Sequence, residues 1–135
     1  MHSLRLFSIL AWIALPTVMY GGYTLLGLLA RGDLSPFQET FFRAGHAHAG
    51  VLLLMSLLYH NFMEQTTLRP ALKVGAAAVV VVGIVAQSGG FFLHMVIGQP
   101  GEPSLGTTIT SLGAALLSGA ILLLVYGLIT SRRES

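Results

Sequence analysis

The residues best suited to chemistry in this chain are five histidines, which stand at His2, His46, His48, His60 and His94. A neutral imidazole can ligate a metal ion or a haem iron, transfer a proton, or hydrogen-bond to a neighbouring helix. The chain contains no cysteine, which excludes disulfides and thiolate metal sites. All the histidines except His2 fall within long apolar stretches. In a membrane such positions are costly for an ionisable group, which usually faces the protein interior.

Four apolar stretches are long enough to cross a bilayer as helices. With 54% hydrophobic and 9% charged residues, a chain of 135 residues lacks the polar surface of a water-soluble domain. The stretches predict one transmembrane domain over residues 1–135, with helices over residues 6–30, 41–63, 72–98 and 107–130. Because the connections are short, successive helices must be antiparallel neighbours. The predicted fold class is therefore all-α, an integral membrane four-helix up-down bundle.

The basic residues predict the orientation of this bundle. The face that holds both termini would collect Arg5, Arg69, Lys73, Arg132 and Arg133, whereas the other face has only Arg31 and Arg43. Basic residues concentrate on the cytoplasmic side of membrane proteins. We therefore expect cytoplasmic termini in a multi-pass protein of the cell inner (plasma) membrane. Seven basic residues are too few for a phosphate-binding stripe, so the expected partner is the lipid bilayer and no nucleic acid.

The topology predicts that three histidines lie together near the exoplasmic face. The second helix enters the membrane from that face and the third returns to it, so His46, His48 and His94 are expected at one depth. About 200° of helical rotation separates His46 from His48, which favours two different ligands on the two sides of that helix. His60 belongs to the opposite end of the second helix, and we expect it, with Asn61, at the membrane interface.

Two further residues favour a planar cofactor. Gly50 follows His46 by one helical turn and leaves room for a flat group against the backbone, and Arg43 could pair with haem propionates. Haem iron needs axial histidines within an apolar shell. We therefore expect a b-type haem (heme b), ligated by His46, His48 and His94, in a protein of electron transport or small-gas binding.

Two other functions remain open. The same three histidines could bind copper or zinc, since imidazole suits both metals, which would make the chain a membrane accessory protein. Alternatively, the chain is a non-catalytic structural membrane subunit in which the histidines hydrogen-bond between helices. Small residues spaced four apart, Gly45 with Ala49 and Ala115 with Gly119, are expected where helices touch.

The segment Ala44–Gly50, with the sequence AGHAHAG, resembles the His-x-His element of haem-copper oxidase subunit I. In that family twelve helices form three four-helix arcs around a pseudo-threefold axis, and the metal-binding histidines lie mainly on the second helix of each arc. The resemblance implies that His46 ligates a high-spin haem, that His48 ligates a low-spin haem, and that His94 corresponds to a copper-site histidine or an opposing axial ligand.

The same resemblance makes the chain similar to one such arc, as a small four-helix bacterial membrane protein. It implies a homo-oligomer, a trimer of three arcs, with a redox partner that the sequence does not identify. The chain lacks the His–Tyr pair and the mid-membrane acid that the family uses. Oxygen reduction by this chain is therefore not expected.

Overall fold

The computed structural model describes residues 4–131, and within them it contains helices and no strand. The helices are α1 (Arg5–Arg31), α2 (Pro36–Glu64), α3 (Pro70–Ile97) and α4 (Leu105–Ser131). Their lengths of 27 to 29 residues correspond to about 40 Å, more than the hydrocarbon thickness of about 30 Å. All four are long and apolar enough to cross a membrane. The predicted all-α, four-helix membrane fold is confirmed.

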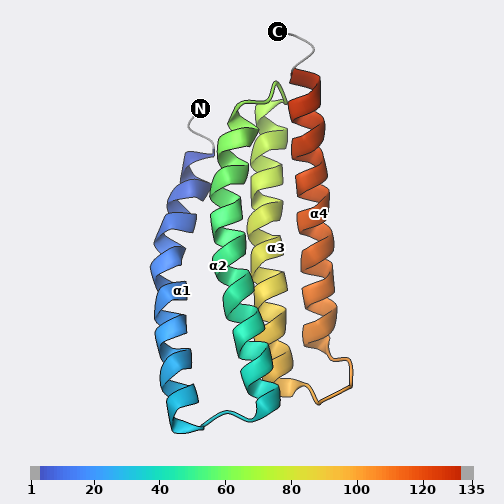
Figure 1. Cartoon of the computed structure of the whole chain (residues 1–135). Coiled ribbons are helices and arrows are strands. Elements are labelled where there is room, and N and C mark those ends of the chain that lie inside the picture. Colours follow the sequence, from blue (N-terminus) through green and yellow to red (C-terminus); the bar gives the residue numbers. More distant parts are fainter. Residues whose placement is uncertain (1–3, 132–135) are drawn as a thin grey trace.

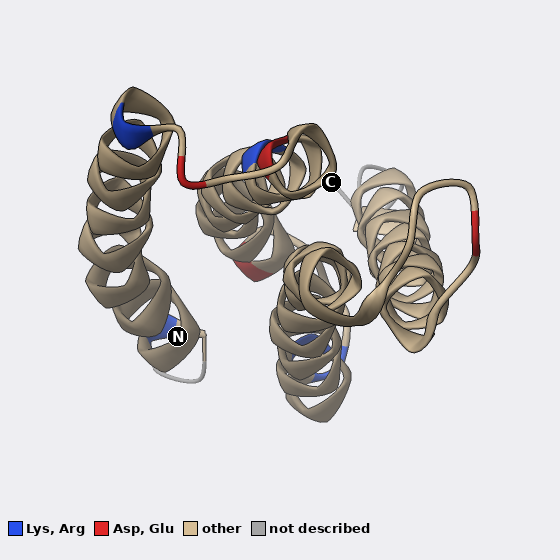
Figure 2. Cartoon of the chain, turned by 90° about the horizontal axis from the view of Figure 1, so that it is seen from below, with Lys and Arg blue, Asp and Glu red and all other residues tan. Residues whose placement is uncertain are grey.

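Successive helices run in opposite directions (Figure 1). The α1–α2 and α3–α4 connections lie at one end of the molecule, which we call the hairpin end. The start of α1, the α2–α3 connection and the end of α4 lie at the other, which we call the terminal end. Charged residues gather near these two ends (Figure 2). Three residues used in the sequence analysis, His2, Arg132 and Arg133, lie outside the described residues.

The second helix begins at Pro36, five residues before the predicted start at residue 41. Ser35 is its N-cap: the Ser35 hydroxyl accepts a hydrogen bond from the Gln38 backbone N–H at 3.2 Å, and the Gln38 side chain accepts one from the Ser35 N–H at 3.0 Å. This reciprocal capping box, followed directly by a proline, starts the helix early. The extra turn adds Phe37 to the surface that meets α3. The other boundaries differ from prediction by at most two residues.

The helices form an open array rather than a closed ring (Figure 2). α1 packs mainly on α2, α2 on α3 and α3 on α4, while α1 and α4 share no contact within the described residues. A smaller contact joins α2 to α4, in which the Tyr59 hydroxyl donates to the Ala120 carbonyl at 3.0 Å. The buried apolar cluster consists of Leu4, Tyr59, Met63, Ala76, Ala77, Val80, Ile84, Leu117 and Ala120. The histidines near the hairpin end lie outside this cluster.

The most extensive helix contact is that of α3 with α4, where glycines spaced seven apart face each other. Gly83 and Gly90 of α3 oppose Gly113 and Gly106 of α4. A Cβ atom added at Gly90 would lie 2.6 Å from the Gly106 carbonyl oxygen, and one at Gly113 would lie 2.8 Å from that of Gly83. Only residues without a Cβ allow this approach of two backbones. These glycines make α3 and α4 one tightly packed unit.

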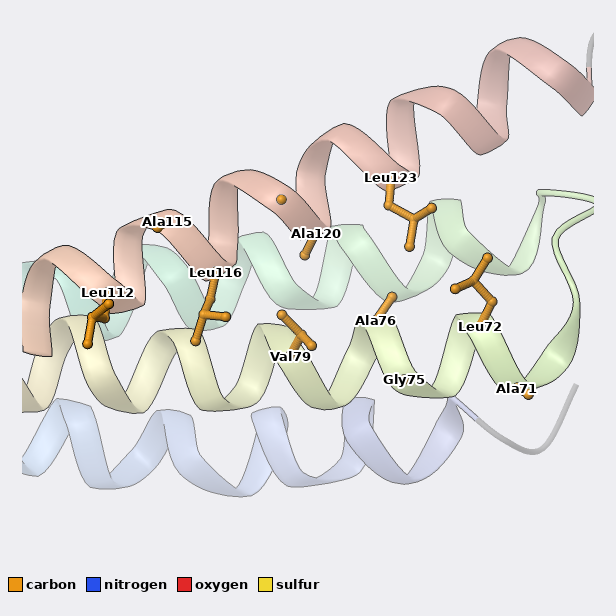
Figure 3. A pocket seen from close by; sticks show the side chains of 11 residues that line it. Ala71, Leu72, Gly75, Ala76, Val79, Leu112, Ala115, Leu116, Ala120 and Leu123 are labelled. Carbon is orange, nitrogen blue, oxygen red and sulfur yellow. The ribbon is translucent and has the colours of Figure 1, made fainter.

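A pocket of 630 Å³ opens between α3 and α4 nearer the terminal end (Figure 3). Only Ala, Gly, Leu and Val line it, so it presents no side chain that could ligate a metal or form a hydrogen bond. Ala115 and Gly119 line this pocket, and a Cβ at Gly119 would meet nothing within 4 Å. The expectation that these two residues mark a tight helix contact is therefore wrong.

Candidate functional site

His94 lies in the last turn of α3, and its side chain is almost fully enclosed, with 3% of its surface exposed. Its Nδ1 is 2.7 Å from the hydroxyl oxygen of Ser104, in the connection to α4. That oxygen also accepts a hydrogen bond from the Gly106 N–H at 3.0 Å. Two aromatic rings from the first turns of α2 contact the imidazole in T-shaped geometry, with 4.3 Å between the centroids of Phe41 and His94 and 5.2 Å between those of Phe37 and His94. His94 therefore joins α2, α3 and the α3–α4 connection.

His48 is half-buried, and its hydrogen bond determines which of its nitrogens is protonated. The Nδ1 atom lies 2.8 Å from the Ala44 carbonyl oxygen. A carbonyl oxygen can only accept a hydrogen bond, so Nδ1 carries a proton, and in the neutral imidazole the lone pair is on Nε2. The imidazole also faces Phe91 of α3, with 4.7 Å between ring centroids. His48 therefore presents an imidazole already in the tautomer of a metal ligand beside an aromatic wall.

His48 and His94 belong to the same side of the α2–α3 pair. Phe41, which touches His94, lies 6.3 Å from Phe91, which touches His48. Phe37, Phe41 and His48 share one face of α2 because they are spaced four and seven residues apart. Two phenylalanine rings thus lie between the two imidazoles.

His46 faces the other side of α2, toward α1. Its ring lies against the α1 backbone, where a Cβ added at Gly22 would be 2.9 Å from the imidazole Nε2. A cavity of 180 Å³ adjoins the ring, and Phe42 and Phe92 contribute to its lining. The predicted separation of His46 and His48 onto opposite sides of one helix agrees with these contacts. Within residues 4–131, His46 makes no side-chain hydrogen bond, in contrast to His48 and His94.

The three histidines occupy the same half of the molecule but do not converge. Among residues 4–131, no three side chains of histidine or acidic residues come together in a way that could hold a metal ion. The expected convergence of the three imidazoles is therefore wrong: His46 faces α1, whereas His48 and His94 lie against the rings of Phe91 and Phe41.

The two residues predicted to help a planar cofactor have other contacts. The Arg43 guanidinium pairs with the Glu39 carboxylate at 2.6 Å, and its side chain is 59% exposed. Gly50 faces α1, where the Val18 side chain lies 3.7 Å from the position of a Cβ. The Gly50 backbone therefore lies against Val18 of α1.

His60 lies one turn before the end of α2, where the sequence predicts it, but it is buried, with only 2% of its surface exposed. Its Nδ1 lies 3.3 Å from the Ser8 hydroxyl oxygen, and the Phe7 ring is 5.9 Å away. The first turn of α1 therefore covers His60. Asn61, the next residue, is exposed as expected.

Comparison of the chain with known protein families, with curated proteins and with solved structures finds no match in any of the three.

Proposed function

We propose that this chain is a b-type haem protein of the membrane, with His48 as an axial ligand of the iron. The observation that carries the proposal is the 2.8 Å hydrogen bond from His48 Nδ1 to the Ala44 carbonyl. Metal-ligating histidines almost always donate their other ring N–H to a carbonyl or carboxylate, which fixes the ring and raises its basicity. Here that second partner belongs to the same helix, so the ring orientation is set before any cofactor binds.

The number of available ligands favours haem over a bare copper or zinc ion. Zinc and copper sites take three or four protein ligands, and no such group is assembled within residues 4–131. The porphyrin supplies four nitrogen ligands to the haem iron, so the protein needs to supply only one or two axial ligands. A single imidazole that is already oriented by a hydrogen bond, such as His48, meets that requirement.

In this proposal the haem supplies one-electron chemistry at its iron, and the protein supplies orientation and an apolar surrounding. Phe91 provides an aromatic wall beside His48. No Lys, Arg, Asp or Glu lies in α2 between Ala44 and Met63, so the surrounding favours a neutral site, and burial of this kind tunes a haem potential. His94 is the second candidate ligand on this side, because its Nδ1 is held by Ser104.

We also propose the finer assignments made from the sequence. The distribution of basic residues favours cytoplasmic termini in the plasma membrane, and the resemblance to one oxidase arc implies assembly of copies into a homo-oligomer. The open array of helices, in which α1 and α4 do not touch, supports assembly because it leaves helix faces without a partner in the same chain.

The haem proposal is tested by an absorbance spectrum of purified protein expressed with ample haem, oxidised and then reduced with dithionite. We expect a Soret band in the wild type, its loss in His48→Ala and a shifted band in His94→Ala. The control is His2→Ala, which removes a histidine outside the apolar stretches and should leave the band unchanged. A colourless wild-type protein, or an unaltered band in His48→Ala, would rule the proposal out.

A structural role is a second candidate, and two hydrogen bonds favour it. His94 bonds Ser104 and His60 bonds Ser8, so each histidine ties its own helix to another segment. Such bonds contribute about 1 kcal/mol in membrane proteins. A purely structural subunit would be colourless and free of metal, and its histidine variants would lose stability without any spectral change.

A further inference from the structure

His60, a titratable side chain that the proposed haem site does not use, is buried between α1 and α2 at the terminal end. Only 2% of its surface is exposed. The first turns of α1 cover it: the Ser8 hydroxyl oxygen lies 3.3 Å from its Nδ1, and the Phe7 ring centroid lies 5.9 Å from that of the imidazole. On its own helix, the Tyr59 ring lies at 6.1 Å. The start of α1 therefore closes the imidazole off from water.

The Nε2 atom of His60 is enclosed and has no hydrogen-bond partner among the described residues. In a neutral imidazole only one nitrogen carries a proton, and Nδ1 has Ser8 as its partner. In the imidazolium both nitrogens carry protons, so a charged N–H would be buried without an acceptor. Burying an unpaired charge costs far more than burying an unpaired neutral group. The closed position of α1 therefore suits the neutral ring and opposes the charged one.

The charged side chains around His60 do not compensate a charge in the closed position. Arg5 of α1 and Glu64 of α2 line a cavity of 270 Å³ that His60 also borders, yet within residues 4–131 His60 forms no ion pair. Arg5 has the same charge as an imidazolium. On α3, the Lys73 ammonium donates to two carbonyls at the end of α2, at 2.7 and 3.2 Å. In α4 the one ionisable side chain among residues 105–131 is Tyr126, which is exposed.

Moving the start of α1 away from α2 would remove this restriction. The imidazole would then open to the polar cavity at the terminal end, where the helices meet water and lipid headgroups. Glu64 follows His60 by four residues, so the two side chains share one face of α2. An uncovered imidazolium would therefore gain both water and a carboxylate, and proton uptake by His60 favours the uncovered form.

The first half of α1 is built to move separately from the rest of the bundle. Pro16 interrupts α1, and because proline has no N–H, the Trp12 carbonyl lacks its helical hydrogen bond. Before this point, a cavity of 290 Å³ lies between α1 side chains, such as Ala11 and Ala14, and those of α2 and α3. Within the described residues α1 has no contact with α4. The segment before Pro16 therefore has a break at one end and incomplete packing beneath it.

We propose that residues 4–15, which we call the α1 cover, form a pH-controlled cover: when His60 takes up a proton, this segment detaches from α2. A free imidazole titrates at about pH 6.5. Below that value, each pH unit should shift the equilibrium toward the detached form by up to about tenfold. The inference does not depend on haem, because His60 and His48 lie at opposite ends of the apolar part of α2.

The experiment measures how often a position beneath the α1 cover reaches water. The chain has no cysteine, so Leu4→Cys, at a position that is 1% exposed, supplies the only thiol of the full-length protein. In nanodiscs, this thiol is labelled with a permanently charged methanethiosulfonate. Its labelling rate is divided by that of Leu6→Cys, at a position that is 59% exposed, which removes the pH dependence of the thiol reaction itself. We expect the ratio to rise about tenfold from about pH 8 to about pH 5.5, and an unchanged ratio would overturn the proposal.

Two further substitutions, each combined with Leu4→Cys and with Leu6→Cys, remove the titrating group. His60→Phe keeps an aromatic ring beneath the cover, and His60→Gln keeps a side chain that can hydrogen-bond Ser8. Neither replacement takes up a proton in this pH range, so we expect the labelling ratio to be independent of pH in both. A rise that persists in either variant would contradict the assignment to His60.

Thr66→Cys controls for a general loosening of the protein at low pH. Thr66 is 5% exposed at the same end of the molecule, and its methyl group faces α4, where a Cβ added at Gly127 would lie 2.9 Å away. We expect its labelling ratio to Leu6→Cys to be the same at both pH values. An equal rise at Thr66 and Leu4 would show that acid loosens the whole terminal end, and the proposal of a separate α1 cover would be wrong.

Discussion

His48 and His94 lie on one side of the α2–α3 pair, with the rings of Phe41 and Phe91 between them. Each imidazole is fixed by a different partner, His48 by a carbonyl of its own helix and His94 by Ser104 of the next connection. The two rings are therefore held independently of each other. This arrangement favours a cofactor that each imidazole can ligate separately.

The first prediction concerns the proton on His48. Because the Ala44 carbonyl accepts from Nδ1, the neutral form of His48 in haem-free protein should be the Nδ1–H tautomer. Solid-state ¹⁵N NMR of histidine-labelled protein measures this directly, and His48→Gln assigns the signal. Protonation at Nε2 instead would remove the observation on which the haem proposal rests.

The second prediction concerns the bond that holds His94. Ser104→Ala removes the hydroxyl that contacts both His94 Nδ1 and the Gly106 N–H. We expect the free energy of unfolding to fall by about 1 kcal/mol. Ser118→Ala is the control, since its exposed hydroxyl bonds only within α4 and should change stability by less than about 0.5 kcal/mol. Equal effects of the two variants would show that the Ser104–His94 bond contributes nothing.

The third prediction tests the glycine contact of α3 with α4. In Gly113→Ala the new Cβ would meet the Gln87 backbone nitrogen and would lie 2.8 Å from the Gly83 carbonyl oxygen. Backbone atoms cannot move aside cheaply, so we expect a loss of about 1–3 kcal/mol in unfolding free energy. Gly119→Ala on the same helix meets nothing within 4 Å, and better helix propensity should leave it neutral or slightly more stable. Denaturant titration in detergent compares the two, and the reverse order would contradict the described packing.

The fourth prediction separates the two sides of α2. Gly22→Ala would bring a Cβ to 2.9 Å from His46 Nε2, and the imidazole can shift to avoid it. We therefore expect the NMR signals of His46 to move while those of His48 stay in place and stability changes by less than about 0.5 kcal/mol. Gly27→Ala, whose nearest neighbour is an Arg31 side-chain nitrogen at 3.7 Å, should move neither. A shift of His48 as large as that of His46 would show that the two sides are coupled.

The helices were predictable because each contains an apolar run longer than a bilayer requires, and short connections leave only antiparallel neighbours. The early start of α2 was missed because Gln38 and Glu39 are polar and look like part of a loop. The signal that marks it is the capping pattern of Ser35, Pro36 and Gln38. Gly83 and Gly90 are seven residues apart, as are Gly106 and Gly113. This spacing is visible in the sequence and indicates the faces on which α3 and α4 meet.

The candidate site was less predictable, because helix length and direction determine depth only to within a turn or two. His46, His48 and His94 were expected to converge, yet among residues 4–131 they form no group that could hold a metal ion, and His46 faces α1. His60 was expected at the interface because it is near a helix end. Its burial depends on how the first turns of α1, with Phe7 and Ser8, pack over α2. Nothing in the local sequence around His60 indicates which helix will cover it.

The most direct test of the central claim, that His48 ligates haem iron, is chemical rescue of the axial ligand. Purified His48→Gly protein is titrated with haem in the absence and presence of free imidazole, and the Soret absorbance is compared with that of the wild type. The proposed ligation predicts saturable haem binding in the wild type, its loss in His48→Gly, and its recovery when imidazole fills the vacated position. Haem binding that is the same in wild type and variant, with no response to imidazole, would contradict it.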